Sequence, residues 1–162
     1  MKSRFVFVRP LIMAMTLLSV VLFACEKSEE NTTPALRSQE YAVSAVNGSG
    51  ADGKIIISEN ADSSFNVQVN INNSVKDTVH VMHIHNGSVG TPGSIAIPLN
   101  GITGTGAAAQ STTMNIKQVI LPDSSVQNIT YSQILNFNGY VNVHYSAAQI
   151  DSLVAQGNIG SN

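Results

Sequence analysis

Alternation of apolar and polar residues is the dominant pattern from Glu40 onward. The clearest stretch is Phe65–Asn72, in which four apolar residues alternate with four Asn or Gln residues. A period of two predicts a strand with one buried and one wet face, as in an antiparallel sheet. The same reasoning predicts strands at Tyr41–Ala45, Lys54–Glu59, Thr78–His85, Ser94–Leu99, Gln110–Ile120 and Gly139–Tyr145. Several short strands at this spacing predict an all-β fold, a sandwich or a barrel.

Two segments near the C-terminus have a helical pattern instead. Thr130–Gln133 and Ser146–Gln149 each place a hydroxyl at an N-cap and a Gln three residues later, which is the capping-box pattern. The helices that they begin are expected to stop at Gly139 and Gly157. We therefore predict a β-sandwich interrupted by two short helices.

The first 24 residues are predicted to be a signal peptide. Three basic residues precede Leu11–Ala24, an uncharged apolar run that is too short to span a bilayer comfortably. Residues 25–38 lack apolar periodicity and predict a flexible tether, and residues 39–162 are expected to form the single domain.

The end of the apolar run, Leu22-Phe-Ala-Cys25, resembles the bacterial lipobox, whose cysteine is diacylated and becomes the new N-terminus. The alternative is an ordinary signal peptide followed by a chance cysteine. Cys25 is the only cysteine, and a lone thiol is unwanted in an oxidising compartment, so lipidation is favoured. The acidic residues in Glu26–Glu30 resemble the signal that exports Bacteroidetes lipoproteins to the outer face of the outer membrane. A solvated tether is the alternative for that segment.

Composition removes several function classes. Charged residues make up 11% of the chain and the formal net charge is −2; without the signal peptide, five basic residues face ten acidic ones. Such a chain has no basic face for a nucleic acid. A single cysteine excludes a disulfide-stapled domain, and the scarcity of Glu and Lys excludes a coiled coil.

Three segments in a fixed order carry a family resemblance. Met82–Gly87 (MHIHNG) leads into a loop and then Gly93–Leu99 (GSIAIPL), and Thr130–Gly139 leads into Tyr140–His144 (YVNVH). This order resembles the CHRD domain over about residues 39–160, in a variant similar to that of Bacteroidetes lipoproteins. The tail departs from the usual Asn-Pro and Gly-Glu-Ile-Arg-Gly, since residues 146–156 intervene. The resemblance implies an exported module without a settled activity.

The histidines are the candidate functional residues. His83 and His85 are two apart on one strand, so they share a face with their Cα atoms about 6–7 Å apart. His144 ends another strand, and three imidazoles meet if the two strands are neighbours. Imidazole suits copper and zinc. The alternative is that these histidines are hydrogen-bonded structural residues that tie the loop 86–93 to the last strand. His80 points to the opposite face and is expected at the surface.

The same three histidines resemble the copper ligands of copper/zinc superoxide dismutases, which carry a His-x-His on one strand and a Val-Val-His near the C-terminus. The resemblance implies an antiparallel Greek-key β-sandwich of the immunoglobulin/superoxide-dismutase type and a metal site. The bridging histidine, zinc ligands, disulfide cysteines and active-site arginine have no counterparts, so dismutase activity is not implied.

No catalytic constellation is found, and we expect a protein that is not an enzyme. The first expectation is a non-enzymatic binding or structural module of the cell envelope, held in the membrane through Cys25, with an unidentified protein or glycan ligand. Tyr131, Tyr140 and Tyr145 would line a glycan-binding face, or pack in the sheet. The alternative function is copper or zinc binding through His83, His85 and His144.

Overall fold

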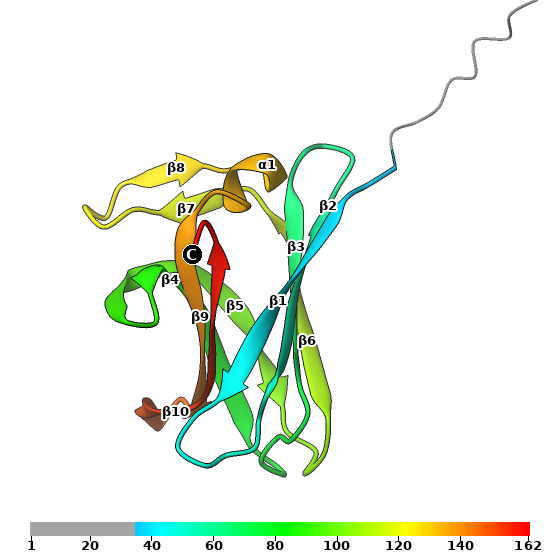
Figure 1. Ribbon diagram of the computed structural model, residues 1–162, viewed down its shortest axis with the longest axis vertical. Coiled ribbons are helices and arrows are strands. Elements are labelled where there is room, and N and C mark those ends of the chain that lie inside the picture. Colours follow the sequence, from blue (N-terminus) through cyan, green and yellow to red (C-terminus); the bar gives the residue numbers. More distant parts are fainter. Residues whose placement is uncertain (1–34) are drawn as a thin grey trace, which may run out of the picture. The chain divides into compact units, whose positions relative to one another are not determined.

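The computed structural model describes residues 35–162, and this part of the chain is almost entirely β-structure (Figure 1). The predicted signal peptide, Cys25 and most of the predicted tether lie outside the described residues. The strands are β1 (Ser38–Ala45), β2 (Gly53–Glu59), β3 (Phe65–Ile71), β4 (Val79–Ser88), β5 (Thr91–Thr103), β6 (Ala109–Ile116), β7 (Gln118–Ile120), β8 (Val126–Asn128), β9 (Asn138–Ser146) and β10 (Gln149–Gly160). The helix in this part is α1 (Tyr131–Ile134). None of its helices is long and apolar enough to cross a membrane.

Eight strands form one antiparallel sheet in the order β5-β4-β9-β10-β1-β2-β3-β6. The first part of β1 pairs with β2, and its last residues, Ser44 and Ala45, pair with β10. The two edge strands meet at Asn100 of β5, whose backbone N–H donates to Thr113 Oγ1 at 2.8 Å and whose Nδ2 donates to the Thr112 carbonyl at 3.0 Å. The sheet is therefore nearly closed, like a barrel. The all-β antiparallel prediction is confirmed. The Greek-key sandwich is not confirmed, because β1 pairs with β2 on one side and with β10 on the other and so joins all eight strands into a single sheet.

The interior of the barrel holds the alternating apolar residues, as the sequence pattern predicted. Phe65, Val67, Val69 and Ile71 of β3 are each at most 1% exposed, and the Asn and Gln residues between them face outward. Burial of these side chains removes apolar surface from water, which is the main stabilising contribution to such a fold.

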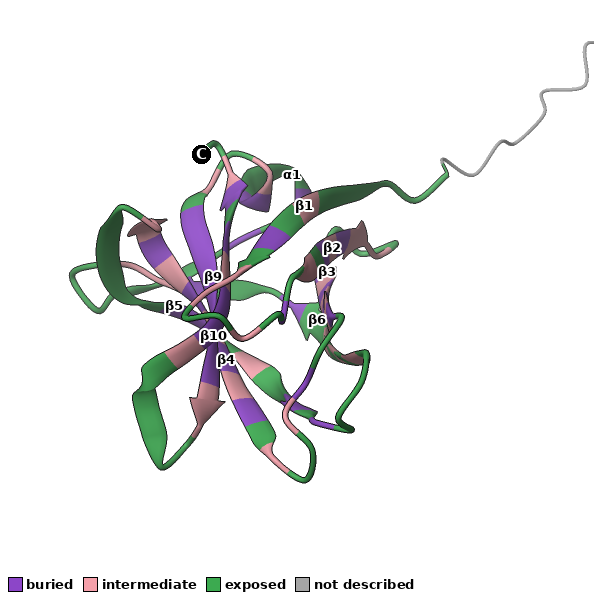
Figure 2. Cartoon of the chain, turned by 60° about the horizontal axis from the view of Figure 1, so that its bottom comes forward, coloured by how far each residue is buried: buried purple, intermediate pink, exposed green. Residues whose placement is uncertain are grey.

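Strand β9 differs from β3 because it is buried on both faces. Its residues Gly139–His144 are all buried, as the continuous colouring of this strand in Figure 2 shows. Val141 and Val143 belong to the core, whereas His144 lies on the other face. The burial of the outward-facing Tyr140, Asn142 and His144 indicates that neighbouring groups gather over this face of β9.

The predicted second helix is wrong. Gln149–Gly160 forms β10, in which Ala155, Gly157 and Ile159 are buried in alternation and the strand pairs with both β9 and β1. A Cβ atom on Gly157 would lie 2.2 Å from the Ala42 carbonyl oxygen, so this glycine permits a close strand approach and is not a helix C-cap. Pairing with two central strands satisfies the backbone on both sides of β10 and overrides the local capping pattern.

The first predicted helix is confirmed in its start and shorter than expected. Thr130 and Gln133 form the reciprocal capping box, but the helix ends at Ile134 and β9 begins at Asn138. The expected loop 86–93 is also mostly strand, because β4 extends to Ser88 and β5 begins at Thr91.

Candidate metal centre

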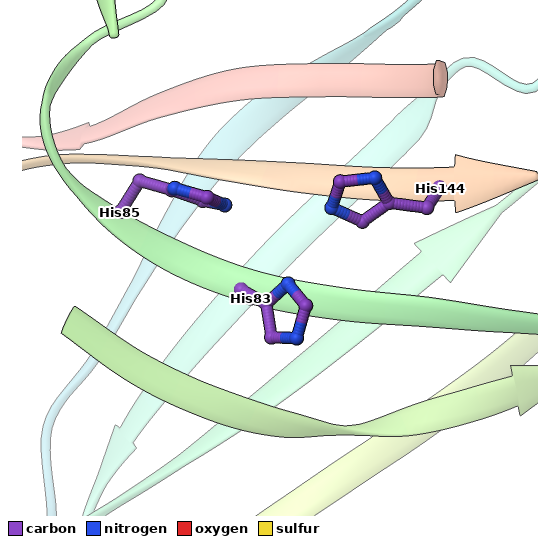
Figure 3. Close-up of side chains that lie close together, drawn as sticks. All are labelled: His83, His85 and His144. Atoms are coloured by element: carbon purple, nitrogen blue, oxygen red, sulfur yellow. The ribbon is translucent and has the colours of Figure 1, made fainter. Parts of the chain in front are cut away.

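Neighbouring strands β4 and β9 bring the three predicted histidines together. The two strands pair antiparallel, with His83 opposite Asn142 and His85 opposite Tyr140. His144 follows two residues after Asn142 and therefore shares its face. Figure 3 shows the His85 and His144 rings pointing toward one another, with His83 beside them on β4. The condition set by the sequence, that the two strands be neighbours, is met.

One ring nitrogen from each histidine faces a common space. The three potential ligand atoms lie within 4.8 Å of one another. His83 Nδ1, His85 Nε2 and His144 Nε2 are buried and have no hydrogen-bond partner in the structure. In a tetrahedral zinc site with Zn–N bonds of 2.0–2.1 Å, ligand nitrogens lie roughly 3.3 Å apart. Small side-chain rotations would therefore bring the three nitrogens to coordination distance.

Backbone carbonyls fix the tautomers of two of these rings. His85 Nδ1 lies 3.0 Å from the Gly93 carbonyl oxygen, and His144 Nδ1 lies against the Ile150 carbonyl oxygen. A carbonyl only accepts, so each Nδ1 carries the proton and each Nε2 keeps its lone pair. Metal-binding histidines are commonly oriented in this way by a hydrogen bond from the second ring nitrogen.

The Gly93 contact depends on a close approach of β5 to β4. A Cβ atom at residue 93 would lie 2.2 Å from the Asn86 carbonyl oxygen, so only glycine fits there. On its other side the His85 ring is stacked on Tyr140, with ring centroids 5.1 Å apart and planes 23° apart. The orientation of His85 is therefore held by a hydrogen bond and an aromatic contact together.

The electrostatic environment favours neutral imidazoles. Burial lowers the pKa of His83, and the neighbouring His144 and His85 lower it further. Burial also lowers the pKa of His144, and this outweighs the opposite effect of its hydrogen bond to Ile150. Neutral imidazole is the form that ligates a metal, so protons compete less for these two nitrogens.

The expectation that His80 is a surface residue is wrong. His80 lies on the opposite face from His83 and His85, as expected, but that face is the core, and the side chain is 0% exposed. The Val75 N–H donates to His80 Nε2 at 3.1 Å, which leaves Nδ1–H to donate to the His144 carbonyl at 3.1 Å. Met82 and Ile84 follow His80 at a spacing of two residues and are apolar, and this pattern indicates that His80 points inward with them.

Sequence reasoning also missed Asn142. Its side chain is 9% exposed on the same outward face as the histidines, and its Oδ1 is buried without a hydrogen-bond partner. The period-two spacing of Tyr140, Asn142 and His144 could have shown that the three share one face.

The remaining candidate surfaces are poorer. Tyr131 and Tyr140 are 1% and 3% exposed, so they pack in the structure and do not form a glycan-binding face with Tyr145. A cavity of about 490 Å³ is lined by Tyr145, by polar side chains and by the apolar residues Val75, Leu153 and Val154, and none of the three clustered histidines lines it. Two of its polar side chains are already engaged by the protein itself: Asn47 Nδ2 donates to the Leu153 carbonyl, and Ser49 Oγ donates to the Val154 carbonyl.

Comparison with known families agrees with the motifs. The family model described as the CHRD domain matches residues 33–149. The chain belongs to the CHRD-domain family. The matched segment of this CHRD domain contains both histidine motifs and ends at Gln149, where β10 begins. No curated protein and no solved structure matches the chain. The likeness to Bacteroidetes lipoproteins and to superoxide dismutases stays a prediction from the sequence.

Proposed function

We propose that this CHRD domain is a non-enzymatic binding module that holds one copper or zinc ion through His83, His85 and His144. The observation that carries the proposal is the convergence of three buried imidazole nitrogens, none with a partner in the protein. Imidazole is a ligand of choice for both metals. The resemblance of the three residues to the copper ligands of superoxide dismutases points the same way.

A purely structural role explains this cluster less well. A structural histidine satisfies both ring nitrogens, and His80 does so through Val75 and the His144 carbonyl. His85 does bond to the β4–β5 hairpin at Gly93, yet its Nε2 stays unpartnered. Buried polar atoms are almost always hydrogen-bonded, so several exceptions in one place indicate a ligand.

A binding role is favoured over catalysis. Membership of the CHRD family supports a binding or structural module. The clustered ligand groups are three histidines and no carboxylate; Asp151 lies near enough to His144 to act on its pKa, but it is exposed and is not one of the clustered groups. An unidentified protein or glycan ligand elsewhere on the sheet is the other binding role that fits the family.

Metal analysis of purified protein tests the proposal. Pro34–Asn162 forms a compact unit with its own core, so a fragment beginning at Pro34 serves. After incubation with Zn²⁺ or Cu²⁺ and dialysis, we expect one ion per chain, and none in a His83→Ala/His85→Ala variant. Less than one ion per ten wild-type chains for both metals would overturn the proposal.

We also propose that the protein is anchored in the bacterial outer membrane by lipid at Cys25. The lipobox resemblance and the use of the only cysteine at that position support this. In the native host, Cys25→Ala should move the protein from the membrane fraction to the soluble fraction. A Ser28→Ala variant is the control, and an unchanged distribution of the Cys25 variant would contradict the anchor.

A further inference from the structure

The unsatisfied polar atoms of this domain are concentrated in one patch. Within residues 35–162, five buried side-chain nitrogen or oxygen atoms have no hydrogen-bond partner. Four of them belong to His83, His85, His144 and Asn142, and the fifth is Nδ2 of Asn70 on β3. The patch therefore contains one oxygen acceptor in addition to the three ring nitrogens.

The register of β4 and β9 puts Asn142 in the middle of the cluster. Asn142 is directly opposite His83, which sets their Cβ atoms about 4.5–5.5 Å apart on the shared face. His144 lies two residues further along β9, and His85 lies opposite Tyr140 on the other side. The His85 and His144 rings point toward one another (Figure 3). Since His85 lies opposite Tyr140, Asn142 is the outward-facing residue of β9 between Tyr140 and His144.

The burial of Asn142 follows from this position. Outward side chains of an antiparallel sheet are normally solvated, yet Asn142 is only 9% exposed. Its Oδ1 is closed off from water and accepts no hydrogen bond in the structure. A buried acceptor without a partner is costly, and a cation in the space next to it removes that cost.

We propose that the side-chain carbonyl of Asn142 is the fourth ligand of the ion held by His83, His85 and His144. This inference rests on the metal-binding function proposed above. Three nitrogens and one oxygen complete the four-coordinate shell that zinc has in structural sites, which leaves no open position for a substrate. All four ligands are neutral, so the ion keeps its full charge and the amide is the weakest of the four donors.

Substitution of Asn142, with Asn70 as the matched control, tests this assignment. Both residues are outward-facing amides with one buried unpartnered atom, but Asn70 lies on β3, away from the histidines. Zn²⁺ affinity is measured by competition with a chromophoric chelator, and coordination is followed by the visible absorption of bound Co²⁺. We expect Asn142→Ala to weaken Zn²⁺ binding about 10–100-fold, the range seen when groups that support a metal site are removed.

The Co²⁺ spectrum separates a ligand from a nearby residue. Asn142→Ala should shift and weaken the visible bands, because one protein donor is lost. Asn142→Asp, which keeps the size of the side chain, should tighten Zn²⁺ binding and give a third spectrum. Asn70→Ala should leave both the affinity and the spectrum unchanged.

Two results would overturn the role of Asn142 while leaving the metal site intact. One is a Co²⁺ spectrum that is the same for the wild type, Asn142→Ala and Asn142→Asp. The other is an equal loss of affinity in Asn142→Ala and Asn70→Ala. Failure of the wild type to bind any metal would instead refute the proposed function, and with it this inference. If Asn142→Ala is unfolded by circular dichroism, the Asn142→Asp spectrum decides alone.

Discussion

The buried side chain of His80 provides the sharpest test of the interior of this domain. Replacement by Leu puts an apolar side chain of similar size on the inward face of β4. It removes both hydrogen bonds that His80 makes, so the Val75 N–H and the His144 carbonyl lose their partner. A surface histidine, as expected from the sequence, would tolerate the same change.

The expected loss can be worked out from these two contacts. A buried backbone group left unpaired costs about 1–3 kcal/mol, so two such groups predict a loss of about 2–6 kcal/mol. The whole free energy of unfolding of a domain is typically about 5–15 kcal/mol. His80→Leu should therefore remove a large share of the stability while leaving the protein folded or marginally folded.

Urea unfolding followed by circular dichroism measures the loss. With a dependence of about 1–3 kcal/mol per molar urea, a loss of at least about 2 kcal/mol should lower the midpoint by at least about 0.7 M. Val79→Ala is the control, because Val79 is the neighbouring residue on the exposed face at 55% exposure, and it should change the free energy by less than about 0.5 kcal/mol. A His80→Leu midpoint equal to that of Val79→Ala would show that His80 does not hold the backbone.

Three further predictions concern the proposed metal site and the sheet. Free Zn²⁺ at 100 times its Kd should stabilise the wild type by about 2.7 kcal/mol in a thermal melt and leave His144→Ala unchanged; equal shifts in both proteins would place the ion elsewhere. Because burial holds the folded-state pKa values of His83 and His144 below their ordinary value of 6.5, the metal-free protein should lose stability as the pH falls from about 6.5 through those lower values. Urea midpoints measured across pH 4–8 follow this loss of stability. If the midpoint of a His83→Gln/His144→Gln variant depends on pH as strongly as that of the wild type, the two histidines are not its cause. Gly157→Ala should cost about 1–3 kcal/mol, since its Cβ would lie 2.2 Å from the Ala42 carbonyl oxygen, whereas Gly90→Ala, with open space around it, should be neutral in the same melt.

The alternation of apolar and polar residues was sufficient to predict most of the strands. Phe65–Ile71 alternates through the whole of β3, and each of its apolar residues is in the core. Periodicity reports which residues of a strand share a face, and that is a local property of the chain. The same logic placed His83 and His85 on one face and His80 on the other.

Local patterns failed where pairing with other strands decided the outcome. Ser146–Gln149 has the residues of a capping box, yet the segment that follows becomes β10 between β9 and β1. Thr130–Gln133 has the same pattern and forms α1. Pairing within the sheet therefore decides which of two segments with the same local pattern becomes a helix. The propensity of a single segment does not predict that outcome.

The sequence by itself determined the all-β class, the family, and the three histidines that are candidate ligands of one metal ion. Only the tertiary structure decided that β4 lies beside β9, that His80 faces the core, and that Asn142 is buried opposite His83. The reason is physical, because periodicity fixes the face of a strand while register and neighbours are fixed by the closure of the whole sheet. A histidine cluster made from two strands far apart in the chain is therefore visible in the sequence only as its separate halves.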